Sequence, residues 1–390
     1  MIEAAIAARM QNLGTETAFE VLARAKALEA QGRRIIHMEI GEPDFDTPAH
    51  IRRAAADALE QGFTHYGPSG GMPETRAAIA DYIAGTRGIP CSPGEVVVTP
   101  GGKPIMYYGI IATVNPGDEV IYPNPGFPIY ESVINFMGGV PVPLPLREEN
   151  DFRLDPDEFE RLLTPRTKLV ILNSPANPTG GVLTREDVRR IASLVRGREI
   201  VVLSDEIYSR IIYEGEAWSI ASEPGLKDQT IILDGFSKTY AMTGWRLGYG
   251  VMPVPLAERI TRLITNSVSC TATFVQLAGK AALEGPQESV EAMVAEFKRR
   301  RDYIVDGLNA IAGVTCKNPA GAFYVFPNVK SFGRSTKEVA DHLLNDAGVA
   351  ALAGTSFGSY GEGYLRLSYA TSLANIEEGL RRIERSLARL

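Results

Sequence analysis

A lysine and an arginine, Lys238 and Arg246, lie eight residues apart in the segment DGFSKTYAMTGWRLGYG (residues 234–250). This segment follows the apolar run Thr230–Leu233 and leads into a second one, Leu247–Val251, so both cations lie at the end of an expected core strand. Lysine and arginine are rarely buried without a partner. A solvated lysine is the ordinary interpretation. A lysine amine can also react with a carbonyl group, however, and an arginine can bind phosphate.

Two glycines follow the strand-like run Glu95–Thr99, in the sequence Pro100-Gly101-Gly102-Lys103 ahead of a helix-like run. Glycines that open a helix leave backbone N–H groups free to bind an anion, and the helix dipole favours negative charge there. The stretch is not a Walker A loop, because Val97 and Pro104 occupy positions where that motif needs Gly and Ser or Thr. It also lacks the third glycine of a dinucleotide fingerprint. A tight turn is the structural alternative.

Two further strand-like runs end in polar residues. Lys168–Leu172 is followed by a turn rich in proline that contains Asn177. Ile200–Leu203 is followed by Asp205, with Tyr208 three residues on. A carboxylate at the end of an apolar strand is desolvated unless it has a cationic partner. The structural alternatives are a proline and asparagine turn for the first segment and a helix N-cap for the second.

These four strand ends supply an anion cradle, an amide donor, a carboxylate near a tyrosine, and a lysine near an arginine. In an open parallel sheet, ligands bind beyond the carboxyl ends of the strands, so the groups are expected to meet in one cleft. The set suits a phosphorylated aromatic aldehyde. Lysine can form a Schiff base with the aldehyde, arginine and backbone N–H groups can bind the phosphate, and a carboxylate can face a ring nitrogen.

The elements that would position these groups follow from short β-branched runs that alternate with amphipathic segments. One such segment, Arg185–Val195, is preceded by Thr184 as an expected N-cap. Continuously apolar strands that alternate with helices predict a mainly parallel seven-stranded sheet covered on both faces. The expected strands are Glu95–Thr99, Glu119–Tyr122, Val140–Leu146, Lys168–Leu172, Ile200–Leu203, Thr230–Leu233 and Leu247–Val251.

The C-terminal third predicts a smaller α+β domain, and the N-terminal helix Thr17–Gln31 is expected to pack on it. The expected elements are a helix at Gln287–Leu308, a strand at Ala322–Phe326, a helix near Lys337–Asp346, a strand at Tyr364–Tyr369 and a final helix to Leu390.

The length, net charge and cysteine and histidine content of the chain argue against several classes of function. A chain of 390 residues is too long for a single core, so two domains are expected. The net charge of −7 argues against binding to nucleic acid or an anionic membrane. Three scattered cysteines fit reduced thiols in the cytoplasm, and Met1–Gly14 has no signal-peptide pattern. The 4 histidines show no ligand spacing, so no metal is expected.

In this order and spacing the motifs resemble class I and II aminotransferases, fold type I enzymes that use pyridoxal 5′-phosphate, and especially their prokaryotic aspartate and aromatic branch. The resemblance runs essentially from end to end. The motifs that carry it are Gly41-Glu42-Pro43-Asp44-Phe45-Asp46-Thr47-Pro48, Tyr66-Gly67-Pro68, Ser174-Pro175-Ala176-Asn177-Pro178-Thr179-Gly180, Ser204-Asp205-Glu206-Ile207-Tyr208, Ser237-Lys238 with Gly244-Trp245-Arg246, and Arg366-Leu367-Ser368-Tyr369-Ala370.

The resemblance implies an α/β fold in three segments. Residues 1–49 would form a helix and segment on the small domain, 50–284 the large cofactor-binding domain, and 285–390 the small C-terminal domain. It also implies a homodimer with shared active sites.

The resemblance implies roles for the residues around the cofactor ring. Lys238 would hold the cofactor covalently and later move a proton. Asp205 would pair with the ring nitrogen, while Asn177 and Tyr208 would hydrogen-bond the ring 3′-oxygen. Phe127 matches the aromatic residue that stacks on the ring. Lys238, Asp205 and Tyr208 are thus the expected catalytic residues.

The cofactor phosphate would be held by Gly101, Gly102 and Arg246, with Tyr66 reaching the phosphate of the partner subunit. Lys103 is grouped with these cofactor-binding residues, although it also matches a lysine that aspartate enzymes use for the distal carboxylate. Family members often have serine three residues before the reactive lysine. Gly235 occupies that position here, and Ser237 is the candidate to compensate.

Substrate binding would involve Arg366, which pairs with the α-carboxylate, assisted by Gly41 and Asn177. The N-terminal stretch that helps related aspartate enzymes bind an acidic side chain is replaced here by the residues 17–22, TAFEVL. Glu20 in this stretch could neutralise Lys103, so a preference for aspartate does not follow from the sequence.

The expected activity is transfer of the amino group of an L-amino acid, either aspartate or a related or aromatic one, to a 2-oxo acid such as 2-oxoglutarate by a ping-pong mechanism. A C–S β-lyase or another elimination enzyme would use the same lysine and aspartate and stays open as an alternative. A non-catalytic effector-sensing regulator is a remote one, because only about forty residues precede Gly41 and they contain no basic recognition helix.

Overall fold

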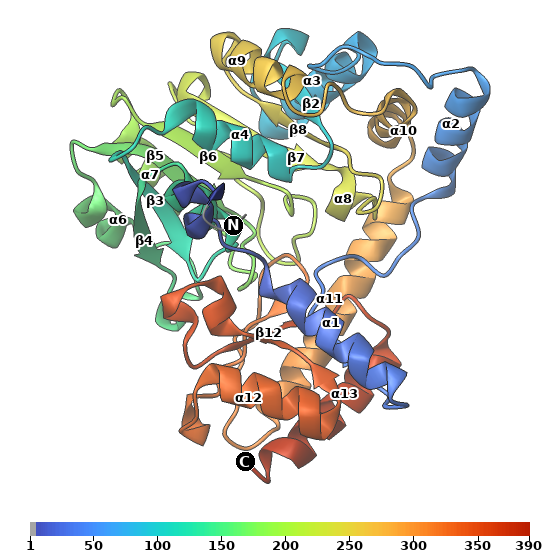
Figure 1. Cartoon of the computed structure of the whole chain (residues 1–390), viewed down its shortest axis with the longest axis vertical. Helices are drawn as coiled ribbons and strands as arrows, with labels where there is room; N and C mark the ends of the chain where they lie inside the picture. The colour runs from blue at the N-terminus through green and yellow to red at the C-terminus, as the bar shows by residue number, and fades with distance from the viewer. Residues whose placement is uncertain (1–4) are drawn as a thin grey trace.

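The computed structural model describes residues 5–390, and its larger part is built on a seven-stranded sheet (Figure 1). In spatial order the strands are β2 (Val96–Thr99), β8 (Gly248–Val251), β7 (Thr230–Gly235), β6 (Val201–Asp205), β5 (Thr167–Asn173), β3 (Glu119–Asn124) and β4 (Val140–Pro145). β8 pairs antiparallel with β2 and β7, and the other neighbours run parallel. The predicted mainly parallel sheet is confirmed, and each expected run forms one strand.

Helices cover both faces of this sheet because successive strand residues are buried on opposite sides. In β2, Val96 and Val98 belong to one apolar cluster and Val97 to another. The helices α4 (Lys103–Thr113), α5 (Ile129–Phe136) and α9 (Val254–Thr265) cover one face. The helices α2 (Ala49–Glu60), α3 (Pro73–Arg87), α6 (Pro156–Leu162), α7 (Arg185–Val195) and α10 (Thr273–Glu284) cover the other.

The carboxyl ends of the three central parallel strands lie side by side. Asn173 at the end of β5 pairs with Asp205 at the end of β6, and Asp205 pairs with Leu233 in β7. The four-residue helix α8 (Phe236–Thr239) continues directly from β7 and carries Lys238. The polar residues that follow these strands therefore meet at one edge of the sheet.

The smaller part contains two short sheets and four helices around a separate apolar core (Figure 1). β1 (Ile36–His37) pairs parallel with β10 (Val349–Ala350), whereas β11 (Leu352–Ala353), β12 (Leu365–Ser368) and β9 (Tyr324–Val325) pair antiparallel. Its helices are α1 (Thr17–Ala30), α11 (Glu288–Asn309), α12 (Thr336–His342) and α13 (Leu373–Leu387). As predicted, α1 packs here, against β10 and β11.

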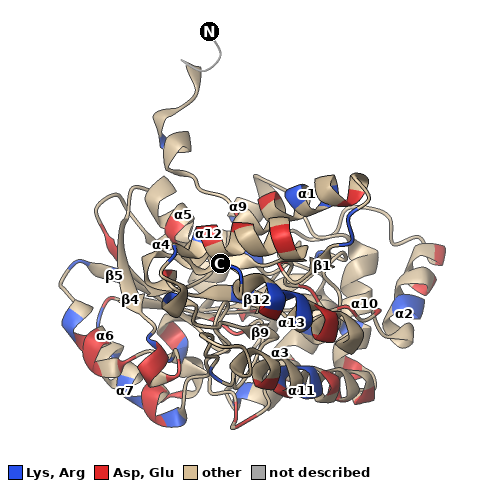
Figure 2. Ribbon diagram, turned by 90° about the horizontal axis from the view of Figure 1, so that it is seen from below, with Lys and Arg blue, Asp and Glu red and all other residues tan. Residues whose placement is uncertain are grey.

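Short helical turns complete the chain: η2 (Ala8–Asn12), η3 (Pro93–Glu95), η4 (Glu148–Asn150), η5 (Ile220–Ser222), η6 (Lys227–Gln229), η7 (Lys330–Phe332), the π-helix η8 (Leu343–Ala347), η9 (Gly354–Phe357) and η10 (Ser359–Gly361). Among residues 5–390, no helix is long and apolar enough to cross a bilayer. Acidic and basic residues are interspersed on the outer helices α7, α11 and α13, whereas α6 is mainly acidic (Figure 2).

A buried ion network connects the edge of the sheet at the carboxyl ends of its parallel strands to α3. The Arg87 guanidinium lies 2.7 Å from a Glu206 carboxylate oxygen and 2.9 Å from one of Asp234, and these three side chains are at most 7% exposed. Burial raises the pKa of Asp234 to about 6, against the lowering effect of Arg87. Glu206 and Asp234 flank the ends of β6 and β7, so the network supports the segments that carry Asp205 and Lys238.

Replacing Arg87 with methionine is expected to lower the free energy of unfolding by about 3 kcal/mol, because two buried carboxylates lose the one cation that pairs with them among residues 5–390. Urea denaturation measures this loss. The deficit should be smaller at pH 5 than at pH 8, because protonation removes the unpaired negative charge. The control Arg87→Lys keeps one charge and should lose less. An unfolding free energy for R87M within 1 kcal/mol of wild type at pH 8 would show that the network is not stabilising.

Candidate active site

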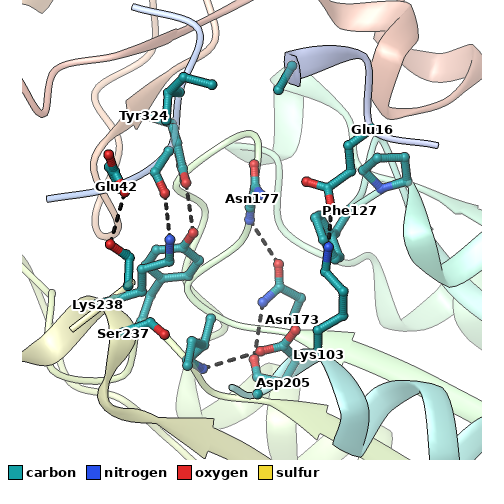
Figure 3. A pocket seen from close by; sticks show the side chains of 18 of the residues that line it. Glu16, Glu42, Lys103, Phe127, Asn173, Asn177, Asp205, Ser237, Lys238 and Tyr324 are labelled. Carbon is teal, nitrogen blue, oxygen red and sulfur yellow. Dashed lines mark hydrogen bonds and ion pairs between the residues drawn. The ribbon is translucent and has the colours of Figure 1, made fainter. Parts of the chain in front are cut away.

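One cavity of about 560 Å³ collects most of the predicted site residues. Figure 3 shows Lys238, Tyr324 and Glu42 on one side, Lys103, Glu16 and Phe127 on the other, and Asn177 and Asp205 between them. The predicted residues that line the cavity are Gly41, Gly102, Lys103, Phe127, Asn177, Asp205, Tyr208, Lys238, Arg246 and Arg366. Gly101 lies next to the lining at the Arg246 side chain, whereas Tyr66 is 89% exposed and does not line the cavity.

Lys238 points its amine into the cavity from α8. Its Nζ donates a hydrogen bond to the Gly41 backbone oxygen at 2.5 Å and lies 5.9 Å from the centre of the Tyr208 ring. Burial, together with the nearby Arg366 and Arg246, lowers the pKa of this amine from 10.5 to about 8, against the raising effect of Glu42. A larger fraction of the amine is therefore neutral, which is the form that reacts with a carbonyl group or accepts a proton.

Asp205 lies at the base of the cavity and is 8% exposed. The Tyr130 hydroxyl donates to one carboxylate oxygen at 2.6 Å, and the Ile207 N–H donates to the other at 3.3 Å. Burial raises the pKa of Asp205 to about 6, although the hydrogen bond from Tyr130 opposes the rise. A cation placed beside this carboxylate would offset its desolvation, so the site suits a protonated ring nitrogen.

Tyr208 and Asn177 line the same cavity as Asp205. The hydroxyls of Tyr208 and Tyr324 are 2.7 Å apart. The Asn173 side-chain oxygen accepts the Asn177 backbone N–H at 2.8 Å, and the Asn173 amide donates to the Asp205 backbone oxygen at 3.1 Å. Asn173 therefore fixes the turn that carries Asn177 to the strand that carries Asp205.

Arg366, on β12, is 4% exposed, and its guanidinium lies between two aromatic rings, 4.6 Å from the centre of Tyr324 and 4.8 Å from that of Phe357. One terminal nitrogen donates to the Asn177 side-chain oxygen at 3.1 Å, and the other donates to the Glu39 backbone oxygen. Neither partner is an anion, and Nε is buried with no hydrogen-bond partner among the described residues. This buried guanidinium forms no ion pair within 4 Å among the described residues, although Glu16 and Glu39 lie near enough to act on it electrostatically, and it suits a carboxylate ligand.

The start of α4 and the side chain of Arg246 form a cradle for an anion. Gly101 has φ +89°, and a Cβ atom there would lie 2.3 Å from an Arg246 nitrogen. A Cβ atom at Gly248 would lie 2.3 Å from the Gly102 backbone nitrogen, so glycine is required at both close approaches. Arg246 donates one hydrogen bond at 2.9 Å, to the Thr243 backbone oxygen, and its other donors remain for a ligand. Ser237 lines the same cavity.

Lys103 forms an ion pair with Glu16, and its Nζ lies 5.4 Å from the centre of the Phe127 ring. The sequence had suggested Glu20 as the carboxylate that neutralises Lys103. The structure corrects this suggestion: Glu20 is exposed on α1 and Glu16, at the residue before the helix, makes the contact.

Sequence reasoning missed Tyr130, Asn173, Tyr324 and Glu16. Tyr130 lies three residues after Phe127, in the first turn of α5, and this proximity along the chain could have indicated a shared site. Asn173 directly ends an expected strand and carried the same kind of signal as Asp205. Tyr324 looked like an ordinary core residue of a strand, and nothing local to Glu16 indicates its long-range contact with Lys103.

Comparisons with known proteins agree with this geometry. The family model of aminotransferase class I and II matches residues 33–383. The chain is 42% identical to aspartate aminotransferase of Pyrococcus abyssi, covering 90% of this chain and 92% of that protein. It is also 42% identical to aromatic-amino-acid aminotransferase 2 of Thermococcus litoralis, covering 92% and 93%. The solved structure of Thermus thermophilus aspartate aminotransferase with maleate has a TM-score of 0.93 at 37% identity, covering 98% and 99%.

The residues present also fit the cofactor of that family. A lysine amine suits the aldehyde of pyridoxal 5′-phosphate, a buried carboxylate suits its ring nitrogen, and the Gly101 and Arg246 cradle suits its phosphate. Because the family model spans most of the chain and the relatives match at about two residues in five along nearly their full length, this chain belongs to the class I and II aminotransferases, fold type I transaminases that use pyridoxal 5′-phosphate.

Proposed function

We propose that this transaminase moves the amino group of an L-amino acid, of the aspartate or aromatic class that its relatives are named for, to a 2-oxo acid such as 2-oxoglutarate. The observation that carries the proposal is a single cavity in which an amine of lowered pKa, a buried carboxylate and a buried guanidinium converge. When bound, pyridoxal phosphate supplies an aldehyde that links to amines and a conjugated ring that accepts electron density from the substrate α-carbon.

Lys238 is the proposed attachment point for the cofactor and the general base. Its pKa of about 8 makes about a quarter of the free amine neutral at pH 7.5, compared with about one in a thousand at the ordinary pKa. The neutral Nζ would accept the α-proton of the bound amino acid and would deliver it to the former aldehyde carbon of the cofactor. The Nζ atom lies 5.9 Å from the centre of the Tyr208 ring and 5.7 Å from that of Phe323, so these two rings form part of its surroundings.

Asp205 is proposed to keep the ring nitrogen protonated, and Tyr130 is proposed to orient its carboxylate. Tyr208 and Asn177 are proposed to hydrogen-bond the ring oxygen, with Phe127 stacked on the ring. Tyr324 holds the Tyr208 hydroxyl and at the same time supports Arg366. Tyr324 therefore contacts both the site proposed for the ring and the site proposed for the substrate carboxylate.

The Gly101–Gly102 turn and Arg246 are the proposed phosphate ligands. Arg366 is the proposed ligand of the substrate α-carboxylate, with Gly41 and Asn177 beside it. Lys103 is assigned to the substrate side of the cavity rather than to the phosphate, because its amine is paired with Glu16 above Phe127. With these assignments, each of the four cations that line the cavity interacts with a different group; they are Lys103, Lys238, Arg246 and Arg366.

Replacing Arg366 with glutamine is expected to raise the KM for every amino acid and 2-oxo acid by about 30-fold, since a charge-assisted pair contributes about 2 kcal/mol. Arg366→Lys should fall between this variant and wild type, because it keeps the charge but loses the two-pronged geometry. Single-turnover half-reactions give the constants, and the absorbance of bound cofactor reports whether the ring site is intact. An unchanged KM in R366Q with an intact absorbance would remove Arg366 from this role.

The reaction type is tested by incubating the holoenzyme with a panel of amino acids and 2-oxoglutarate. Formation of glutamate and the matching 2-oxo acid, with parallel lines in initial-rate plots, supports the proposal. Release of pyruvate and ammonia from cysteine-type donors without glutamate would instead support the β-lyase alternative. Intersecting initial-rate lines would contradict the ping-pong mechanism.

We also propose a homodimer with shared active sites, located in the cytoplasm. The dimer is supported by Tyr66, whose motif implies a contact with a partner's phosphate and whose side chain is 89% exposed in the single chain. Ile6 and Met10 are exposed apolar residues of the N-terminal segment, which packs against α5 through η2. Light scattering of the purified protein measures the assembly. The division at residues 49/50 and 284/285 is kept as a proposal for the domain boundaries.

A further inference from the structure

The ion pair between Glu16 and Lys103 occupies the part of the cavity where a substrate side chain would lie. Of the four cations that line the cavity, Lys238, Arg246 and Arg366 are taken by the cofactor and the α-carboxylate in the proposed function, on which this inference rests. Lys103 remains, and Figure 3 shows it across the cavity from Lys238, next to Phe127. A side chain extending away from the α-carbon therefore meets Lys103 already paired with a carboxylate of the same chain.

The Glu16 side chain contacts Lys103 instead of capping the N-terminus of α1. It occupies the N-cap position of α1, yet its side chain caps no backbone N–H of that helix. Serine, threonine, aspartate and asparagine are the usual residues there, because their short side chains reach the N–H groups. The longer Glu16 side chain, 19% exposed, reaches across to Lys103 at the first residue of α4. The pair thus joins the N-terminal segment to the large sheet part.

The charge balance at this position disfavours anionic side chains. With Glu16 present, the Lys103 ammonium is already neutralised, so a substrate carboxylate must displace the Glu16 carboxylate or lie beside it. A neutral side chain needs no displacement. Phe127 contacts Lys103, and the lining of the cavity also includes the apolar residues Ile40, Met106 and Phe357, which can cover an apolar or aromatic side chain.

We propose that Glu16 is a specificity-determining residue: it acts as an internal counter-ion for Lys103 that competes with dicarboxylic substrates, and it shifts donor preference toward amino acids with neutral apolar or aromatic side chains. A dicarboxylic 2-oxo acid can still bind, because the pair is partly exposed and such pairs are weak. Its distal carboxylate takes the place of Glu16 on Lys103.

The test is the holoenzyme variant Glu16→Gln, which keeps the side-chain size and removes the charge. The KM for aspartate, glutamate and 2-oxoglutarate is expected to fall about fivefold, the ratio that corresponds to about 1 kcal/mol for a partly exposed ion pair. The KM for phenylalanine and leucine is expected to change less than about twofold, because these side chains place no charge near Lys103. The matched control is Glu20→Gln, which removes a carboxylate from the first turn of the same helix without touching Lys103.

A binding measurement separates recognition from turnover. Calorimetric titration of the holoenzyme with succinate and with 3-phenylpropanoate compares an unreactive dicarboxylate with an unreactive aromatic acid. E16Q should bind succinate about fivefold more tightly and 3-phenylpropanoate unchanged. Adding Lys103→Met to E16Q should abolish the gain for succinate, since the lysine is the group that the gain depends on.

Equal effects of E16Q and E20Q, or equal effects of E16Q on dicarboxylic and aromatic substrates, would overturn the inference. So would weaker binding of succinate to E16Q. All these outcomes compare KM or binding constants between variants of an enzyme that does transfer amino groups. Failure of the proposed function looks different, because then no donor yields glutamate even with the wild-type protein.

Discussion

Replacing Lys238 with alanine is expected to lower kcat of the half-reaction about 10⁴-fold, the upper range for loss of a positioned general base. The amine has a pKa of about 8, points into the cavity and lies near the Tyr208 and Phe323 rings, whereas a water molecule in its place would be a far weaker base. The loss should appear in kcat rather than in KM, because Arg366 still binds the substrate carboxylate. Single-turnover absorbance measurements follow the reaction directly.

Two controls distinguish loss of the Lys238 general base from structural damage to the site. Lys238→Arg keeps a cation of similar length but stays protonated, so it should be as inactive as the alanine variant. Small primary amines added to K238A should restore part of the rate, with rates that rise with amine basicity, because they can occupy the vacated volume as a base. A kcat for K238A within about tenfold of wild type would show that another group moves the proton.

Replacing Asp205 with asparagine is expected to lower kcat about 10³-fold. A charge pair at about 4 Å with an effective dielectric of about 20 contributes about 4 kcal/mol, or about three pKa units on the ring nitrogen. The asparagine amide keeps the volume and a hydrogen bond but not the charge, so the ring would be deprotonated at neutral pH and would accept less electron density. Half-reaction rates with a single donor measure the loss.

The conservative variant Asp205→Glu retains the charge and should recover a substantial part of the rate. Tyr130 should become less important in D205N, since the hydroxyl that donates at 2.6 Å to the carboxylate loses its charged acceptor. The combined variant D205N/Y130F should therefore be little slower than D205N alone. A loss of less than about tenfold in D205N would contradict the proposed pairing with the ring nitrogen.

Much of this site is predictable from the sequence because parallel strands deliver their carboxyl ends to one edge. Once Lys168–Leu172, Ile200–Leu203 and Thr230–Leu233 are identified as neighbouring buried strands, the residues after them must converge, and Asp205 and Lys238 do so. The register of β5, β6 and β7 places Asn173, Asp205 and Leu233 side by side.

The contacts between distant segments could not be predicted in this way. Glu16 and Glu20 lie four residues apart around the start of one helix, and their local sequence does not indicate which reaches Lys103. That choice depends on how the N-terminal segment packs against the small part and crosses to α4. Arg87 is a similar case, because its carboxylate partners come from two strand ends more than a hundred residues away.

The central claim is that the Lys238 amine forms the covalent link to pyridoxal phosphate. Borohydride reduction of the holoenzyme fixes such a link, and mass spectrometry of the digested protein locates it. The expected result is one modified peptide, which carries the reduced cofactor on Lys238 and is absent from K238A. A cofactor attached to a different lysine, or an unmodified Lys238 in protein that holds the cofactor and transfers amino groups, would contradict the account.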